Sequence, residues 1–273
     1  MRPNDPQKLD RLTRPARGLL HQQRSFEHFE LTRFEPSEAL APYVENYWMI
    51  LWDLTGRPAY DQQNLSHPSQ HLVLDPQGQT GIFGVSSGTF NYRLEGSGRV
   101  LGTKFRPGAF RGFFGRPVSA LTDTFVPVEA VFGRGGAELD REFVQLNNPL
   151  GMAERIEDLL LERLPELDPK AARARQIVEA IAAQPDVYSV AQVAAEFAIT
   201  TRSLQRLFDT YIGVSPKWVI DRYRMIEAVE ALNRGEALSL TELAHRLGFF
   251  DQAHFTHTFQ ALTGTAPSAY RQA

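Results

Sequence analysis

The stretch SVAQVAAEFAITTRSLQRLFDTYIGVSP (residues 189–216) decides the fold of the C-terminal part of the chain, because it returns as SLTELAHRLGFFDQAHFTHTFQALTGTAP (residues 239–267). Each copy has the apolar spacing of two helices around a short turn, and each ends in Gly-x-x-Pro. The matched pairs are Ser189 and Ser239, Val193 and Leu243, Ala194 and Ala244, Ala198 and Gly248 and, after one inserted residue, Leu204 and Phe255, Phe208 and Phe259, Gly213 and Gly264, and Pro216 and Pro267. This duplication predicts two helix-turn-helix units, at about 190–212 and about 240–263.

The turn inside each unit needs a residue with a positive φ angle. Gly248 supplies it in the second unit without steric cost. Ala198 occupies the matching position of the first unit, where a non-glycine residue costs on the order of 1 kcal/mol. The first turn is therefore expected to be strained or to be built differently.

A connecting helix is expected between the units, with Pro216 at its start and Gly235 at its end. Its buried face would be formed by Trp218, Ile226, Val229 and Leu232. A helix of about 18 residues spans roughly 27 Å. It would hold two recognition helices about one DNA turn apart, roughly 34 Å, on one face of the duplex.

With these stretches, the chain resembles the DNA-binding domain of the AraC/XylS family of bacterial transcription regulators. The residues that carry the resemblance are SVAQVAAEFAITTRSLQRLFDTYIGVSPKWVIDRYR and LTELAHRLGFFDQAHFTHTFQALTGTAPSAYR. The resemblance implies seven helices, two helix-turn-helix units, and a variable N-terminal domain that often senses a small molecule.

The candidate DNA-reading residues lie on the face of each second helix that points away from its apolar side. Arg pairs with guanine, Gln pairs with adenine, and methyl groups contact thymine. In the resembled family, the positions of Arg202, Gln205 and Arg206 commonly face the major groove. The full candidate set is Thr201, Arg202, Gln205, Arg206 and Lys217 with the first unit, and Gln252, Ala253, Thr256 and His257 with the second. Further phosphate contacts are expected from Lys217, Arg222, Arg224 and Arg271.

The second recognition helix has no Lys or Arg, although phosphate contacts dominate the affinity of proteins for DNA. We therefore expect the first unit to supply most of the affinity for DNA, and the second to discriminate between base sequences while adding little affinity. A solvated helix face in the first unit, and a packing repeat that never touches bases in the second, are the alternatives.

The fold class expected is α+β and multidomain: an N-terminal cupin-like β-barrel with flanking helices, then an all-α double helix-turn-helix domain. Short runs divided by Gly, Pro, Asn and Asp predict strands over 26–126, and helices are expected at 136–147 and 152–164. The expected divisions are a flexible basic arm at 1–24, a sensor domain at 25–165, a linker at 165–169 and a DNA-binding domain at 170–273. The stripe Ile156, Leu159, Leu160 and Leu164 would pack on the barrel or form a homodimer interface.

In the N-terminal part, SHPSQHLVLD and GRVLGTKFRPGAFRGFFGRPVSALTD are similar to an uncharacterised sensor domain found in one branch of that family. Lys104 and Arg106 share a strand face and could hold a carboxylate or phosphate. The candidate effector-binding residues are Lys104, Arg106, Trp48, Trp52 and His71. His67 and His71 lack the ligand spacing of metal cupins, so no metal and no cofactor is expected.

Composition narrows the function classes. There is no cysteine, which excludes disulfides, thiolate metal sites and a cysteine nucleophile. The net charge is −3, so DNA binding has to rest on local placement of charge. No signal peptide or membrane span is visible, and a cytoplasmic protein is expected.

The leading hypothesis is a transcription regulator, not an enzyme. Its expected partners are double-stranded DNA, an unknown small-molecule effector and, for an activator, RNA polymerase. Two other classes stay open: an interaction adaptor that has lost DNA binding, and a metal-dependent cupin enzyme fused to a DNA-binding module.

Overall fold

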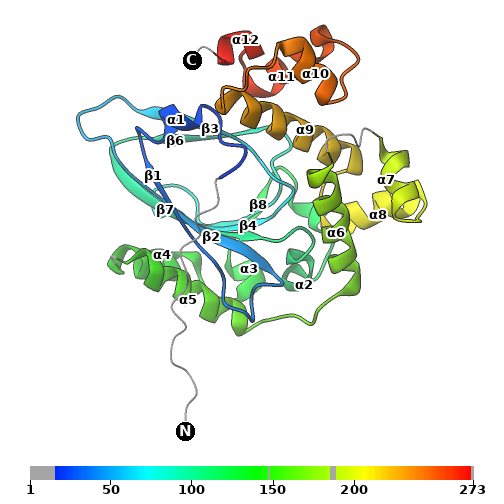
Figure 1. Cartoon of the computed structure of the whole chain (residues 1–273). Coiled ribbons are helices and arrows are strands. Elements are labelled where there is room, and N and C mark those ends of the chain that lie inside the picture. The colour runs from blue at the N-terminus through cyan, green and yellow to red at the C-terminus, as the bar shows by residue number, and fades with distance from the viewer. Residues whose placement is uncertain (1–15, 147, 185–188, 272–273) are drawn as a thin grey trace.

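The computed structural model describes residues 16–146, 148–184 and 189–271. A domain of antiparallel strands and short helices fills the N-terminal part, and helices alone fill the C-terminal part (Figure 1). The expected fold class is confirmed. In the described residues the strands are β1 (Glu30–Phe34), β2 (Val44–Asp53), β3 (Tyr60–Leu65), β4 (His71–Leu74), β5 (Gly81–Phe83), β6 (Thr89–Leu94), β7 (Ser97–Phe105) and β8 (Phe125–Val126).

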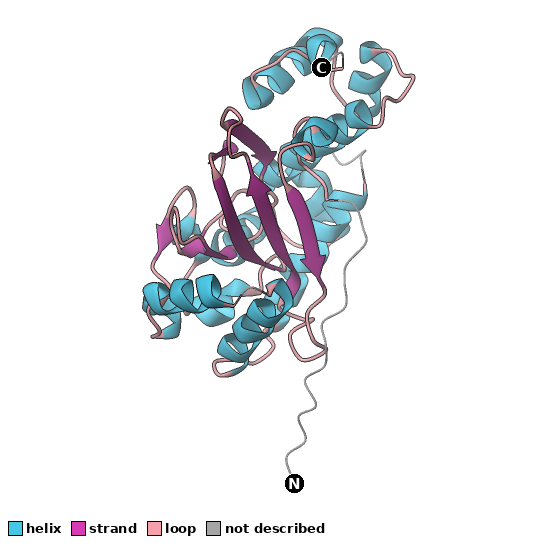
Figure 2. Ribbon diagram, turned by 90° about the vertical axis from the view of Figure 1, so that its left-hand side faces the viewer, coloured by secondary structure: helices cyan, strands magenta, loops and turns pink. Residues whose placement is uncertain are grey.

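The strands form two facing sheets in the described part of the chain. One has six strands in the order β1-β2-β7-β4-β5-β8, and the other pairs β3 with β6. The helices of this domain are α1 (Gln22–Ser25), α2 (Phe110–Phe114), η1 (Val118–Leu121), α3 (Glu129–Phe132), α4 (Gly136–Gln145) and α5 (Pro149–Leu161). Helices α4 and α5 lie along one end of the sheet, away from the C-terminal helices (Figures 1 and 2).

The period-2 alternation of β2 gives the large sheet two different faces. Tyr47 and Met49 point into a core shared with α2 to α5. Trp48 and Trp52 point the other way, toward the two-stranded sheet, in a second apolar cluster. The sheet is therefore covered by helices on one side and closes a space on the other.

The stripe on α5 packs on the sheet domain. Ile156, Leu159 and Leu160 are buried in the same core as Tyr47, whereas Leu164 lies beyond the helix and is exposed. This face is consequently used within the chain. The helix ends at Leu161 because Pro165 follows, and Asp168 then caps the next helix by accepting from the Lys170 amide at 2.8 Å.

The C-terminal part has the seven helices that the family resemblance implies, within the described residues. They are α6 (Pro169–Ala183), α7 (Val190–Glu196), α8 (Thr201–Tyr211), α9 (Pro216–Asn233), α10 (Leu240–Arg246), α11 (Gln252–Thr263) and α12 (Pro267–Tyr270). Helix α9 lies between the sheet domain and α10 to α12 (Figure 1).

The two helix-turn-helix units have the same turn. Ala198 adopts φ 50° and Gly248 adopts φ 71°, so the first turn is not built differently. In each unit the residue after this position donates its amide five residues back: Ile199 to Ala194 O at 3.0 Å, and Phe249 to Ala244 O at 2.9 Å. The first unit therefore carries the backbone strain that its alanine implies.

The expectation of a flexible arm through residue 24 is wrong for its described part. Residues 1–15 lie outside the described residues, but from residue 17 the chain is held. Leu19 and Leu20 are buried, and Arg17 pairs with Glu227 of α9 at 2.8 Å. Leu20 packs with α9 in the core of the second unit. Apolar burial and an ion pair fix this segment between the two domains.

Arg222 of α9 joins the domains through a buried guanidinium, 2% exposed. Its Nη2 donates to Ser87 O at 2.6 Å and to Gly88 O at 2.9 Å, in the loop between β5 and β6. The ring of Trp218 lies 4.5 Å from the guanidinium carbon. Burial lowers the pKa of Arg222 to about 10, so the group stays charged at neutral pH and depends on these carbonyls.

Replacing Arg222 with alanine is expected to lower the free energy of unfolding by about 2–4 kcal/mol, since a buried side chain and its two charge-assisted hydrogen bonds to the Ser87 and Gly88 carbonyls are lost. Urea denaturation followed by circular dichroism measures it. Lys217→Ala on the same helix is the control. Lys217 is exposed and pairs with Asp221, and such a surface pair contributes at most about 1 kcal/mol. Similar losses for the two variants would contradict the structural role of Arg222.

Candidate nucleic-acid interface and ligand cavity

Helix α8 presents a polar face to solvent. Thr200 caps it by accepting from the Ser203 amide at 3.1 Å, and Leu204 and Phe208 are buried in the unit. On the opposite side the structure exposes four of the predicted residues: Thr201, Arg202, Gln205 and Arg206. Their common exposure follows from helical spacing at i, i+3 and i+4.

Helix α11 presents a polar face without a fixed positive charge. Asp251 caps it by accepting from the His254 amide at 2.7 Å. Gln252, Ala253 and His257 are exposed, and Thr256 is half-buried. The Gln252 carbonyl oxygen accepts from the Thr241 hydroxyl at 2.7 Å, which holds this amide at the start of the helix.

The predicted phosphate contacts divide into two groups. Lys217 and Arg271 are exposed. Arg222 is buried against the sheet domain, so the expectation that it contacts phosphate is wrong for this arrangement of domains. The Arg224 Nε donates to Leu247 O at 2.6 Å, and its guanidinium covers the Phe249 ring, which makes it part of the second unit's packing.

Sequence reasoning missed two cations beside α8. Lys170 and Arg173 of α6 line a hollow together with Arg206, Ser203 and Thr210. Both cations are exposed. Both residues stand in the first turns of α6, and α6 packs on α8. Helical spacing predicts α6 itself, but it does not predict that α6 crosses α8.

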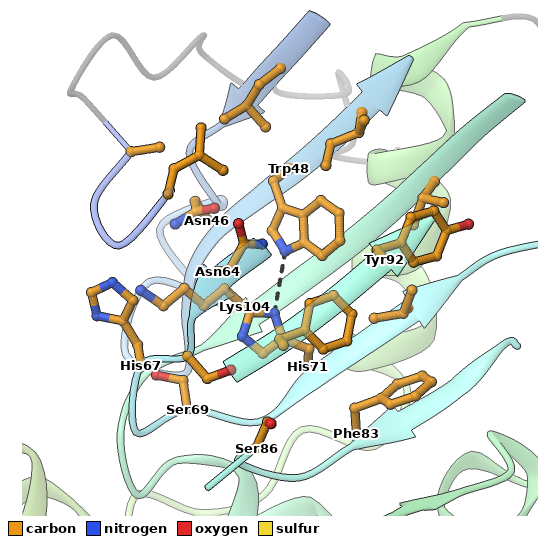
Figure 3. Close-up of a pocket in the computed structure, with 18 of the residues that line it drawn as sticks. Asn46, Trp48, Asn64, His67, Ser69, His71, Phe83, Ser86, Tyr92 and Lys104 are labelled. Carbon is orange, nitrogen blue, oxygen red and sulfur yellow. Dashed lines mark hydrogen bonds between the residues drawn. The ribbon is translucent and has the colours of Figure 1, made fainter. Parts of the chain in front are cut away.

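A cavity of about 990 Å³ lies between the two sheets (Figure 3). Residues that face inward on β1 to β7 line it, and the five predicted effector residues are all among them: Lys104, Arg106, Trp48, Trp52 and His71. The structure thus brings together side chains from β2, from β4 and from β7 with the residue that follows it. Aromatic and aliphatic groups form most of the wall, as is usual in small-molecule sites.

Lys104 and two histidines form the polar end of this cavity (Figure 3). Lys104 Nζ lies 2.9 Å from Glu45 Oε1, and its side chain is 13% exposed. Trp48 Nε1 donates to His71 Nδ1 at 3.3 Å. Burial, aided by the Lys104 charge, lowers the pKa of His71 to about 3 and that of His67 well below its usual value.

Both histidines are therefore neutral at physiological pH, and their partners fix the tautomers. His71 Nδ1 accepts from Trp48, so its Nε2 carries the proton. His67 Nε2 lies 3.1 Å from Arg17 O and has to donate, so its Nδ1 is an acceptor. The polar end offers one ammonium group and both kinds of neutral imidazole nitrogen.

Two further polar atoms of the cavity lining have no partner. Gln62 Oε1 and Ser69 Oγ are buried and make no hydrogen bond, and both residues line the cavity. Buried polar groups are usually satisfied, so these two atoms are exceptions within the described residues. Among the described residues, no group of three His, Cys, Asp or Glu side chains could hold a metal ion.

One wall of the cavity is also an interdomain contact. Gly84 and Ser86 line the cavity, while the carbonyls of Ser87 and Gly88 accept from Arg222. Asp123, another lining residue, accepts from the Ser87 amide and hydroxyl, both at 2.7 Å. The loop at 84–88 is thus held by the DNA-binding-type domain on one side and faces the cavity on the other.

The neutral state of His71 predicts a pH dependence of stability. Its folded-state pKa is about 3 and its unfolded value is about 6.5, so the unfolded state binds more protons between these values. Stability is then lost as pH falls below about 6.5, by about 2 kcal/mol at pH 5 from this group. Denaturation of wild type and His71→Asn at pH 7 and pH 5 tests this. The variant should lose less, and an unchanged pH slope would refute the assignment.

Two family models match the chain: a helix-turn-helix domain over residues 193–273, and a domain of unknown function (DUF6597) over residues 32–127. The transcriptional activator RhaS of Escherichia coli O139:H28 is 35% identical over 80 residues, which are 29% of this chain and 28% of RhaS. The chain therefore spans less than a third of the curated relatives that it matches.

Two solved structures are similar to the chain at low TM-scores. A probable AraC family transcriptional regulator from Rhodopseudomonas palustris is 27% identical, covering 36% of this chain and 93% of that one, with a TM-score of 0.33. ToxT from Vibrio cholerae is 13% identical over 90% of this chain and 94% of its own, with a TM-score of 0.39. Residues 193–273 are therefore similar to the helix-turn-helix domains of transcriptional regulators such as RhaS, and a domain of unknown function matches residues 32–127 before them.

Proposed function

We propose that the chain is a sequence-specific DNA-binding transcription regulator that reads two successive major-groove segments. The observation that carries this proposal is the pair of capped helices, α8 and α11, that expose polar faces at the two ends of one connecting helix (Figure 1). Helix α9 has 18 residues, which correspond to about 27 Å. Two motifs in one chain would then do what two subunits do in a dimeric repressor.

The two units would contribute differently to DNA binding. Arg202 and Arg206 of α8 supply charge and guanine recognition, and Lys170 and Arg173 add phosphate contacts beside them. Helix α11 offers amide, imidazole and methyl groups through Gln252, His257 and Ala253, which read bases without much affinity for phosphate. Thr201, Gln205 and Thr256 complete the reading faces, and Lys217 contacts the backbone.

The N-terminal domain would bind a small-molecule effector in its cavity. Its volume of about 990 Å³ lies at the upper end of the usual range for such sites. Lys104 would hold a carboxylate or phosphate by exchanging Glu45 for the ligand, while Trp48 and Trp52 contact the apolar body. Arg106 is anchored by its Nε to Ala41 O at 2.6 Å, which leaves the far end of the guanidinium to the cavity.

Within the described residues, no helix is long and apolar enough to cross a membrane. A regulator of this kind would act in the cytoplasm, where the chromosome lies. An activator would also contact RNA polymerase, and a homodimer would double the length of DNA that is read.

Selection from a random duplex library with the full-length chain, followed by footprinting of the selected DNA, tests the function. Protection of two successive major-groove segments on one face would support it. Enrichment of no sequence over non-specific DNA would contradict it and favour an adaptor role.

Arg206→Ala is expected to weaken binding to the selected DNA by about 1–3 kcal/mol, because it removes a charged base contact. Thr256→Ala should cost much less, since this residue is half-buried and brings no charge. Fluorescence anisotropy at several salt concentrations gives both values and the salt slope. Equal losses would disprove the division of labour between the units.

Lys104→Met is expected to abolish binding of anionic ligands by the cavity while leaving the fold in place, because methionine keeps the length of the stem. A thermal-shift screen with aromatic and aliphatic carboxylates and phosphates measures this. A hit that stabilises wild type and Lys104→Met equally would show that the anion is held elsewhere.

A further inference from the structure

The second helix-turn-helix unit contains one residue more than the first, and the structure identifies it as Phe250. The two turns have equivalent hydrogen bonds up to Ile199 and Phe249: the Ile199 amide donates to Ala194 O, and the Phe249 amide donates to Ala244 O. In the first unit the cap, Thr200, follows Ile199 at once. In the second unit Phe250 stands between Phe249 and the cap, Asp251.

Phe250 does not belong to the packing of its unit. Its side chain is 89% exposed, the highest value among the large apolar side chains of the described residues. Phe249 beside it is 6% exposed and packs on Phe255, with ring centroids 5.4 Å apart. The extra residue therefore contributes nothing visible to stability in this unit, although a free phenyl ring in water is unfavourable.

The position of Phe250 places it where DNA would lie. It directly precedes the capped start of α11, and recognition helices contact base edges with their N-terminal residues. Gln252 and Ala253, the next exposed residues along the chain, are predicted base contacts of the same unit. An exposed ring at this point would be covered only when the second unit enters the groove.

We propose that Phe250 is a DNA-contacting residue that packs against the 5-methyl group of a thymine in the segment read by α11. The inference rests on the proposed function. The thymine methyl is the apolar group that the major groove offers, and phenylalanine is among the side chains that contact it. Such a contact supplies affinity by burial of apolar surface, in a unit whose recognition helix has no Lys or Arg.

The test compares Phe250→Ala with the full-length wild type on DNA selected by the wild type. We expect a roughly tenfold loss of affinity, which corresponds to about 1.4 kcal/mol, with an unchanged salt slope because no phosphate contact is lost. Phe250→Leu should retain most of the affinity. Val144→Ala is the matched control, since Val144 is an exposed apolar residue, 57% exposed, on α4 of the other domain.

A second measurement locates the methyl group. Deoxyuridine in place of thymine within the footprint of the second unit should weaken wild-type binding at one position and leave Phe250→Ala binding unchanged there.

Affinity of Phe250→Ala equal to wild type would overturn the inference and leave the proposed function intact. Loss of affinity without any deoxyuridine effect would overturn the thymine contact. Failure of the wild type to select any DNA would overturn both proposals.

Discussion

Two buried charges on α9 determine how the domains are placed. Arg222 and Glu230 are nearly inaccessible to water, and a buried charge is tolerated only when it is bonded. Both find partners in the N-terminal part: Arg222 at the carbonyls of Ser87 and Gly88, and Glu230 at the Gly18 amide, 3.0 Å away. Docking removes water from both charges and replaces it with these fixed dipoles. A register that buried either charge without these partners would be strongly disfavoured.

The same helix also carries the cores of both units. Val219 and Ile220 pack with the first unit and Ile226 and Val229 with the second. Side chains of the N-terminal part join each core, Val85 the first and Leu20 the second. The two recognition helices are therefore not hinged freely on a linker. Their spacing is set by a helix that is itself packed on the sheet domain.

Prediction from sequence succeeded where a local rule decides structure. Repeated spacing, Gly-x-x-Pro stops and the Pro216 start gave the two units and α9, because caps and helical periodicity act within a few residues. It failed where partners are far apart in the chain. The role of Arg222 depends on a loop about 130 residues away, and the order of the first segment after residue 17 depends on α9. The strain at Ala198 was foreseen as a cost, yet surrounding packing holds the turn in that conformation. Lys104, Trp48 and His71 belong to one predicted effector-binding set, and the folded sheets bring them to the lining of one cavity. Their assignment as an effector site, like the DNA contacts, stays a prediction.

The loop at 84–88 has one face in the cavity and gives its carbonyls to Arg222. A guest that prefers one position of this loop also prefers one position of α9. Coupling between two binding sites is reciprocal. If a guest in the cavity changes the affinity of α8 and α11 for their ligand by some factor, that ligand changes the affinity of the cavity for the guest by the same factor. The cavity's dissociation constant would then not be a property of the N-terminal domain alone. It would depend on what α8 and α11 have bound, and a truncated domain would report a different ligand affinity from the whole chain.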